Sequence, residues 1–212
     1  MAMPPPIALP PLEPLLAALD MAGVAVFAIS GALAAARIKQ TIVTFAFFAA
    51  ITGIGGGTLR DLLIDAPVFW VGRSDYLGIC LVAAACVWLL KADRWRMNAL
   101  LWFDALGLGA YSVLGAAKSL SVGVPPLVAV AMGVLTASFG GIVRDLLAGE
   151  PSILLRREIY VSAAALGAGT YVGLTLLGLP MWPAALIGAG AGFGLRGIAI
   201  VTGLALPGYR ED

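Results

Sequence analysis

The sequence contains no histidine, and only 12% of its 212 residues are charged. The lack of imidazole excludes histidine zinc ligands, serine–histidine catalysis and histidine proton relays. No nucleophile–base pair or metal-ligating cluster stands out among the other residues. The net charge of +1 does not indicate a nucleic-acid partner. We therefore expect no enzyme, no catalytic residue, no bound metal or cofactor and no nucleic-acid partner.

Cysteines and N-terminal charges are also scarce. Cys80 and Cys86, the two cysteines, are six residues apart on one expected helix. At 100° per residue they point to different faces, so we expect apolar packing and no disulfide. Residues 1–14 are rich in proline and carry no basic residue. A cleaved signal peptide begins with positive charge, so this segment is expected to be an irregular, uncleaved lead-in.

Hydrophobic residues make up 61% of the chain, and the mean hydropathy is +0.99. Soluble domains have about 25% charged residues, twice the fraction found here. About 20 apolar residues are needed to cross about 30 Å of hydrocarbon. The sequence therefore predicts an all-α membrane protein with seven transmembrane helices. Their expected ranges are 15–36, 41–64, 76–91, 98–119, 125–148, 158–178 and 182–204.

The first six expected helices form a duplicated unit. Matching residues are separated by a constant 84 positions, through glycines, charges and prolines alike. The pairs include Asp20/Asp104, Gly23/Gly107, Gly31/Gly115, Thr52/Thr136, Gly56/Gly140, Arg60/Arg144, Asp61/Asp145, Pro67/Pro151 and Tyr76/Tyr160. Because each unit has three helices, the second enters the membrane from the opposite side, as in many transporters. We therefore predict two inverted repeats, 15–91 and 98–178, followed by a seventh helix at 182–204.

Basic residues between the helices are unevenly distributed. One side of the predicted topology collects Arg37, Lys39, Lys91, Arg94, Arg96, Arg156, Arg157 and Arg210. The other side has only Arg73 and Lys118. Lysine and arginine favour the cytoplasmic side. The N-terminus is therefore expected outside the cell and the C-terminus in the cytoplasm.

Glycines followed by an arginine and an aspartate occur at the same place in both repeats, at 55–61 and 140–145. Glycine within a helix costs about 1 kcal/mol relative to alanine. The glycines therefore indicate either bent helices whose freed backbone groups line a polar path, or two closely packed helices. The expected path-lining residues are small or carry hydroxyls: Thr52, Gly55, Gly56, Gly57, Thr136, Ser138, Gly140 and Gly141.

Ionisable side chains lie within the expected helices. Charges in hydrocarbon are costly and mark pathways or buried pairs. From their levels in the membrane, we expect Asp20 to approach Arg60 and Asp104 to approach Arg144. Alternatively, the arginine and aspartate of each motif only fasten their own loops. The candidates for charged gates or structural pairs are Asp20, Arg60, Asp61, Asp104, Lys118, Arg144 and Asp145.

Lys118 has no counterpart in the first repeat, where Ala34 holds the equivalent position. Its side chain either extends to the outer interface or lies in the polar path. In the path it would repel cations or sense voltage.

The doubled motif, together with the segments Pro67–Trp70 and Arg157–Tyr160, resembles the bacterial relatives of the trimeric intracellular cation (TRIC) channels. This family is also described as a duplicated glycine-transporter-like domain. The resemblance covers residues 15–205. It implies a homotrimer in the lipid of the bacterial inner membrane, with seven helices and a separate pore in each protomer. It also implies that the second and fifth helices carry the pore, which passes potassium and other monovalent cations.

Two functions from different classes fit these features. The first is a passive cation channel. The second is an alternating-access carrier for a small zwitterion such as glycine, with arginine holding the carboxylate and aspartate the ammonium group. Inverted repeats occur in both classes. The lack of a clear acidic residue at the membrane midplane favours the channel.

Overall fold

The computed structural model describes residues 14–90, 96–155 and 157–207, and the expected lead-in at 1–13 lies outside them. Within these ranges the chain is helical apart from its loops, and one isolated bridge pairs Glu158 with Ala205. The all-α prediction is confirmed. The helices are α1 (Pro14–Arg37), α2 (Ile42–Leu63), α3 (Asp75–Leu89), α4 (Arg96–Ser121), α5 (Pro126–Leu147), the short 3₁₀ helix η1 (Ile153–Leu155), α6 (Val161–Leu176) and α7 (Met181–Thr202).

Five helices of the described chain are long and apolar enough to cross a membrane: α1, α2, α4, α5 and α7. The third helix of each repeat is shorter than predicted. α3 has 15 residues and α6 has 16, which at 1.5 Å per residue gives about 22 to 24 Å. The expected start of α6 at 158 is wrong, because residues 158–160 belong to a loop that pairs with the C-terminal segment.

Prolines mark several helix starts. Pro14 is the first residue of α1, Pro126 opens α5, and Pro180 directly precedes α7. Proline suits these positions because the first helical N–H groups have no partner within the helix. At the start of a helix, the missing N–H of proline removes no hydrogen bond within the helix.

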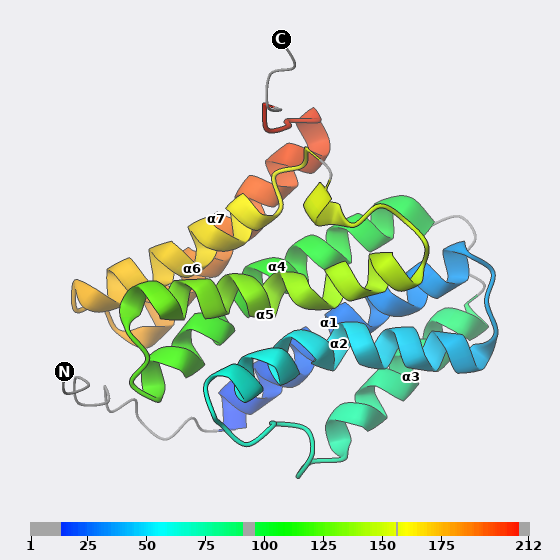
Figure 1. Ribbon diagram of the computed structural model, residues 1–212, viewed down its shortest axis with the longest axis horizontal. Helices are drawn as coiled ribbons and strands as arrows, with labels where there is room; N and C mark the ends of the chain where they lie inside the picture. Colours follow the sequence, from blue (N-terminus) through cyan, green and yellow to red (C-terminus); the bar gives the residue numbers. More distant parts are fainter. Residues whose placement is uncertain (1–13, 91–95, 156, 208–212) are drawn as a thin grey trace.

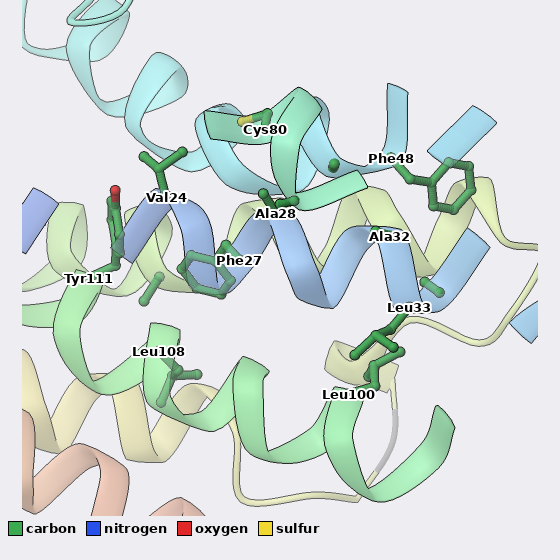
Figure 2. Packing of buried hydrophobic residues seen from close by; sticks show 14 of the residues in the cluster. Val24, Phe27, Ala28, Ala32, Leu33, Phe48, Cys80, Leu100, Leu108 and Tyr111 are labelled. Carbon is green, nitrogen blue, oxygen red and sulfur yellow. The ribbon is translucent and has the colours of Figure 1, made fainter. Parts of the chain in front are cut away.

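The four helices α1, α2, α4 and α5 form the centre of the molecule, with α3 on one flank and α6 and α7 on the other (Figure 1). α1 packs on α4 through a reciprocal contact. A Cβ at Gly23 would meet the Tyr111 ring, and one at Gly107 would meet the Phe27 ring. These rings lie 5.3 Å apart between their centroids, within the buried cluster of Figure 2. The earlier residue on α1, Gly23, meets the later residue on α4, Tyr111, and the order is reversed for Phe27 and Gly107, so α1 and α4 are antiparallel.

α2 and α5 cross in the same reciprocal way. A Cβ on Gly56 would lie 2.1 Å from the Thr136 carbonyl oxygen, and one on Gly140 would lie 2.3 Å from that of Thr52. Equivalent helices of the two repeats therefore run in opposite directions. This confirms the inverted repeat, and α7 stands outside it, packed against α4 and α6.

The glycines serve close packing at this crossing. α2 and α5 are continuous helices through their glycines. The helix assignment thus shows no break at the glycines, and a bend that lines a path stays a prediction. Of the two interpretations, the observed contacts favour the close approach of two backbones.

Candidate functional site

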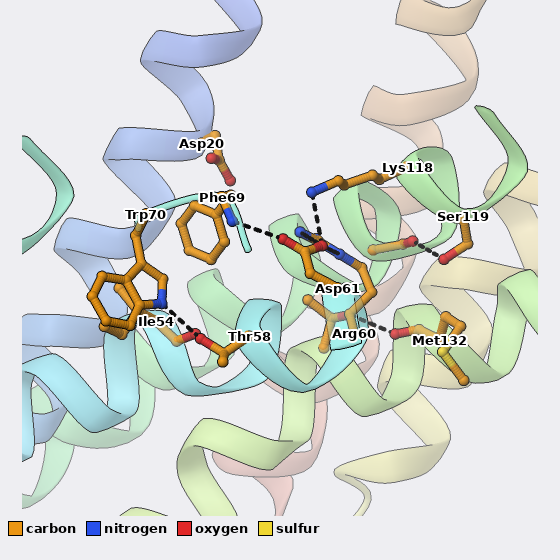
Figure 3. Close-up of polar contacts among 12 residues, drawn as sticks. Asp20, Ile54, Thr58, Arg60, Asp61, Phe69, Trp70, Lys118, Ser119 and Met132 are labelled. Atoms are coloured by element: carbon orange, nitrogen blue, oxygen red, sulfur yellow. Dashed lines mark hydrogen bonds and ion pairs between the residues drawn. The ribbon is translucent and has the colours of Figure 1, made fainter. Parts of the chain in front are cut away.

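A buried charged cluster lies at the end of α2, and Figure 3 shows its residues. The Arg60 guanidinium contacts Asp61 Oδ1 at 2.8 Å through Nε and at 2.7 Å through its terminal nitrogen. The Lys118 ammonium reaches across from α4 to the same oxygen at 2.7 Å. Lys118 is therefore a partner of Asp61, a contact that neither alternative included, and its place in a path stays a prediction.

We call this the outer cluster, after its predicted side of the membrane, and the equivalent group on α5 the inner cluster. The loop after α2 folds back over the outer cluster (Figure 3). The Phe69 N–H donates to Asp61 Oδ2 at 3.0 Å, and the Phe69 ring lies 6.0 Å from the Arg60 guanidinium. The Trp70 indole donates to the Thr58 hydroxyl at 2.9 Å. Asp61 thus fastens its own loop while its carboxylate contacts two cations.

Asp20 is held by tyrosines. Its carboxylate accepts the Tyr76 hydroxyl at 2.6 Å and the Tyr111 hydroxyl at 3.1 Å. Among the described residues Asp20 makes no ion pair with Arg60, so the expected Asp20–Arg60 pair is wrong. The physical reason is that two neutral donors already satisfy Asp20, while Arg60 turns to the adjacent Asp61.

The inner cluster lies at the end of α5 and is centred on Arg144, whose side chain is 2% exposed. Its guanidinium contacts Asp145 at 2.8 and 2.9 Å, Asp104 at 2.5 Å and the Ser30 hydroxyl at 2.6 Å. The expected Asp104–Arg144 pair is present. One buried arginine therefore contacts two carboxylates and joins α1, α4 and α5.

The loop after α5 repeats the arrangement after α2. The Ile153 N–H donates to Asp145 Oδ2 at 3.1 Å, and Ile153 is the repeat equivalent of Phe69. The backbone is left-handed at Asp65 (φ 52°) and at its equivalent, Gly149 (φ 70°), which turns each loop back after its helix. Each arginine–aspartate motif thus fastens its own loop, as one alternative predicted. Each motif also contacts α4, through Lys118 in the first repeat and Asp104 in the second.

The hydroxyls and glycines expected to line a path lie between the two clusters and are buried. The Thr136 hydroxyl donates to the Met132 carbonyl at 2.6 Å, and that of Ser138 donates to Val134 at 2.7 Å. The Thr52 hydroxyl is buried without a hydrogen bond among the described residues. These residues occupy the α2–α5 crossing, and their contact with a permeating ion stays a prediction.

A second buried arginine, which the sequence analysis did not single out, lies on α7. Arg196 is 2% exposed and pairs with Glu158 at 2.6 Å. Its guanidinium also lies 5.3 Å from the centre of the Tyr160 ring. The Tyr160 hydroxyl faces Gly141 beside Asp104. The sequence could have indicated this site, because Arg196 is an arginine within an apolar helix. The comparison of the two repeats did not reveal it, because α7 lies outside the repeat.

The described residues contain no group of three or more histidine, cysteine, aspartate or glutamate side chains that could hold a metal ion. The two clusters instead combine arginine or lysine with aspartate at opposite ends of an antiparallel helix pair. Such clusters can neutralise or repel charged solutes at the two mouths of a membrane protein.

Comparison with known proteins gives consistent matches. The sequence model of the family described as "Glycine transporter" matches residues 17–92 and 101–175, one match for each repeat. A UPF0126 membrane protein of Vibrio cholerae is 37% identical over 92% of this chain and 83% of its own length. The UPF0126 inner membrane protein YadS of Escherichia coli K12 is 34% identical over 92% of this chain and 96% of its own length.

Solved structures give the same fold. A structure of the TRIC trimeric intracellular cation channel orthologue from Rhodobacter sphaeroides superposes with a TM-score of 0.87 at 43% identity, covering 91% of this chain and all of that one. A structure described under conductance through TRIC cation channels has a TM-score of 0.83 at 27% identity and covers 93% of this chain and 98% of its own. These relatives are membrane proteins and channels, not enzymes. The chain is therefore a membrane protein that belongs to the glycine-transporter family, in which the prokaryotic TRIC orthologues share its fold.

Proposed function

We propose that the protein is a cation channel whose conduction path runs between the outer and inner charged clusters, along α2 and α5. The observation that carries the proposal is a pair of symmetry-related charged clusters at opposite ends of two antiparallel membrane helices. Buried charge within a membrane is expensive and is typical of ion pathways. The likeness to structures of TRIC cation channels supports the same function.

The α2 and α5 backbones touch at the middle of the proposed path, so we infer that this conformation is closed. Gly56 and Gly140 bring the α2 and α5 backbones into contact, and the hydroxyls of Thr136 and Ser138 bond within their own helix. Conduction therefore requires α2 and α5 to separate at this crossing. The separation would release hydroxyl and carbonyl oxygens toward the path, where they could replace part of an ion's hydration shell.

We also propose the conducted ion, the assembly and the orientation in the membrane. Potassium is the proposed principal ion, with other monovalent cations also passing. The protein works as a homotrimer in a bacterial inner membrane, with one path in each protomer, the N-terminus outside and the C-terminus in the cytoplasm. The excess of basic residues at the Arg37 end of α1 supports this orientation, and the trimeric Rhodobacter sphaeroides relative supports the assembly.

Planar-bilayer recording from the purified protein tests the function. We expect unitary current steps with a reversal potential that follows the potassium gradient. The description of the matching family as a glycine transporter favours a second candidate, a carrier of small zwitterions. Silent bilayers together with saturable uptake of labelled glycine into proteoliposomes would support that carrier and reject the channel.

Lys118 offers a test at the outer mouth. Replacement with methionine keeps most of the side-chain length but removes the charge, which leaves Asp61 paired with Arg60 alone. The outer cluster becomes more attractive to cations, so we expect single-channel conductance to rise about fivefold, as for an entry barrier lowered by about 1 kcal/mol. Lys118→Arg keeps the charge and should conduct like the wild type. Equal conductance of Lys118→Met and wild type would place the lysine outside the path.

A further inference from the structure

One difference between the two mouths lies at a position that the repeat makes equivalent. At the outer mouth Lys118 of α4 places its ammonium 2.7 Å from Asp61 Oδ1. At the inner mouth the equivalent residue of α1 is Ala34. Beside Ala34 lies a cavity of about 30 Å³, whose wall also includes Arg144 and Asp145. A cavity needs about 10 to 15 Å³ to hold a water-sized occupant. The space that a lysine ammonium fills on one side is therefore open on the other.

The two aspartates reflect this difference. Each accepts an arginine on Oδ1 and a loop N–H on Oδ2. Asp61 also accepts the Lys118 ammonium, and its side chain is completely buried, whereas that of Asp145 is 12% exposed. A carboxylate offers about four acceptor positions. Asp145 thus faces the cavity with room for one more cationic partner.

The charge balance points the same way. The outer cluster combines two cations, Arg60 and Lys118, with the carboxylates of Asp61 and Asp20, which gives a formal charge of zero. Among the described side chains, the inner cluster combines Arg144 with Asp104 and Asp145, which leaves one excess negative charge. At the rim of the cavity Arg37 and Glu150 pair at 3.3 Å and add no net charge.

We propose that this cavity binds one monovalent cation beside Asp145, at the position equivalent to the Lys118 ammonium. The inference rests on the proposed function and deepens it, because it assigns to the conducted ion a site at the inner mouth. The two arginines in the wall do not prevent binding, since Arg37 is paired with Glu150. At the outer mouth Arg60 and Lys118 already share one oxygen of Asp61.

A monovalent ion fits better than a divalent one. An ammonium group and a potassium ion carry the same charge and are similar in size. Calcium takes about six to eight oxygen ligands, and magnesium demands a near-ideal octahedron. Within the described residues no cluster of three or more acidic or other metal-ligating side chains is present. The inner site therefore takes an ion that stays partly hydrated.

Thermal unfolding of the purified protein, followed by tryptophan fluorescence, tests the site. Potassium chloride is compared with N-methyl-D-glucamine chloride at equal ionic strength. A cation that binds only the folded state stabilises it, so potassium should raise the melting temperature of the wild type, and the bulky organic cation should not. Ala34→Ser, which keeps the cavity, should retain the potassium effect.

Ala34→Lys and Ala34→Met separate charge from volume. Both fill the cavity, so both should lose the potassium-dependent rise. Only Ala34→Lys supplies an ammonium to Asp145, so it alone should melt in N-methyl-D-glucamine as the wild type does in potassium. No potassium effect on the wild type, or a full effect in both filled variants, would overturn the site.

Bilayer recordings from the same wild-type preparation keep this inference separate from the proposed function. Potassium currents without a potassium effect on melting would refute the inner site and leave the channel standing. Potassium-dependent melting that is lost in the filled variants, from a protein that carries no current, would refute the channel and keep a cation-binding site.

Discussion

Replacing Gly56 with alanine is expected to destabilise the folded protein by at least about 3 kcal/mol, because it overpacks the α2–α5 crossing. The new Cβ would lie 2.1 Å from the Thr136 carbonyl oxygen and 3.0 Å from its carbonyl carbon. These are backbone atoms, so no side-chain rotation relieves the contact, and the two helices must move apart. Heat or detergent unfolding, together with the yield of monodisperse protein, measures the loss.

Gly55→Ala is the matched control. It lies next to Gly56 on α2, but the nearest atom to its added Cβ, on the Phe139 ring, is 4.0 Å away. Alanine is favoured over glycine in a helix by about 1 kcal/mol, so this variant should be as stable as the wild type or more stable. Gly140→Ala should resemble Gly56→Ala, since its Cβ would meet the Thr52 carbonyl oxygen at 2.3 Å. If Gly56→Ala were as stable against unfolding as the wild type, the helices could not cross this closely.

The topology could be predicted because it depends on features that survive in a single sequence. Apolar runs give the helices, and a constant offset of 84 residues relates residues as different as Gly56 and Arg60 to their partners in the second repeat. Three helices per repeat then dictate the inversion. α6 is shorter than predicted because residues 158–160 bond to other segments: Glu158 pairs with Arg196 on α7 and bridges Ala205.

The role of the glycines could not be decided from the sequence, because glycine permits both a bend and a close approach. The deciding fact is which backbone lies opposite. The backbone opposite Gly56 is the Thr136 carbonyl of α5. The sequence of α2 alone does not show that this carbonyl lies there. The repeat does relate the contacting residues, since Thr52 and Thr136 are separated by the same 84 positions as Gly56 and Gly140.

The charged pairs show how equivalent positions can take different partners. Asp104 contacts Arg144 as expected, but Asp20 bonds to Tyr111. The repeat equivalent of Tyr111 is Phe27, which has no hydroxyl to offer at the inner mouth. The inner carboxylate therefore has one tyrosine donor fewer and takes the arginine. The Tyr111 hydroxyl is thus one difference between the two networks. The offset pairs Phe27 with Tyr111, but it does not show which carboxylate the hydroxyl reaches.

Arg144→Met is expected to cost about 3 to 5 kcal/mol of stability, because it leaves two buried carboxylates without their common cation. Methionine fills most of the arginine's length, so the effect reports the lost charge and not an open space. Asp104 and Asp145 are 2% and 12% exposed as side chains, so water compensates for little of the loss. Unfolding in mixed micelles, compared with the wild type, gives the difference.

The equivalent outer variant, Arg60→Met, should cost less, because Asp61 keeps the Lys118 ammonium at 2.7 Å. Asp104→Asn should also be mild, since Arg144 and Asp145 still neutralise each other. Arg144→Met leaves two carboxylates without their cation, and adding Asp104→Asn removes one of these two charges. The double variant should therefore lose less stability than the sum of the losses of the two single variants. Simple additivity, or equal losses for Arg60→Met and Arg144→Met, would contradict the charge balance described for the two mouths. The asymmetry between these variants follows from one lysine that the outer cluster has and the inner cluster lacks.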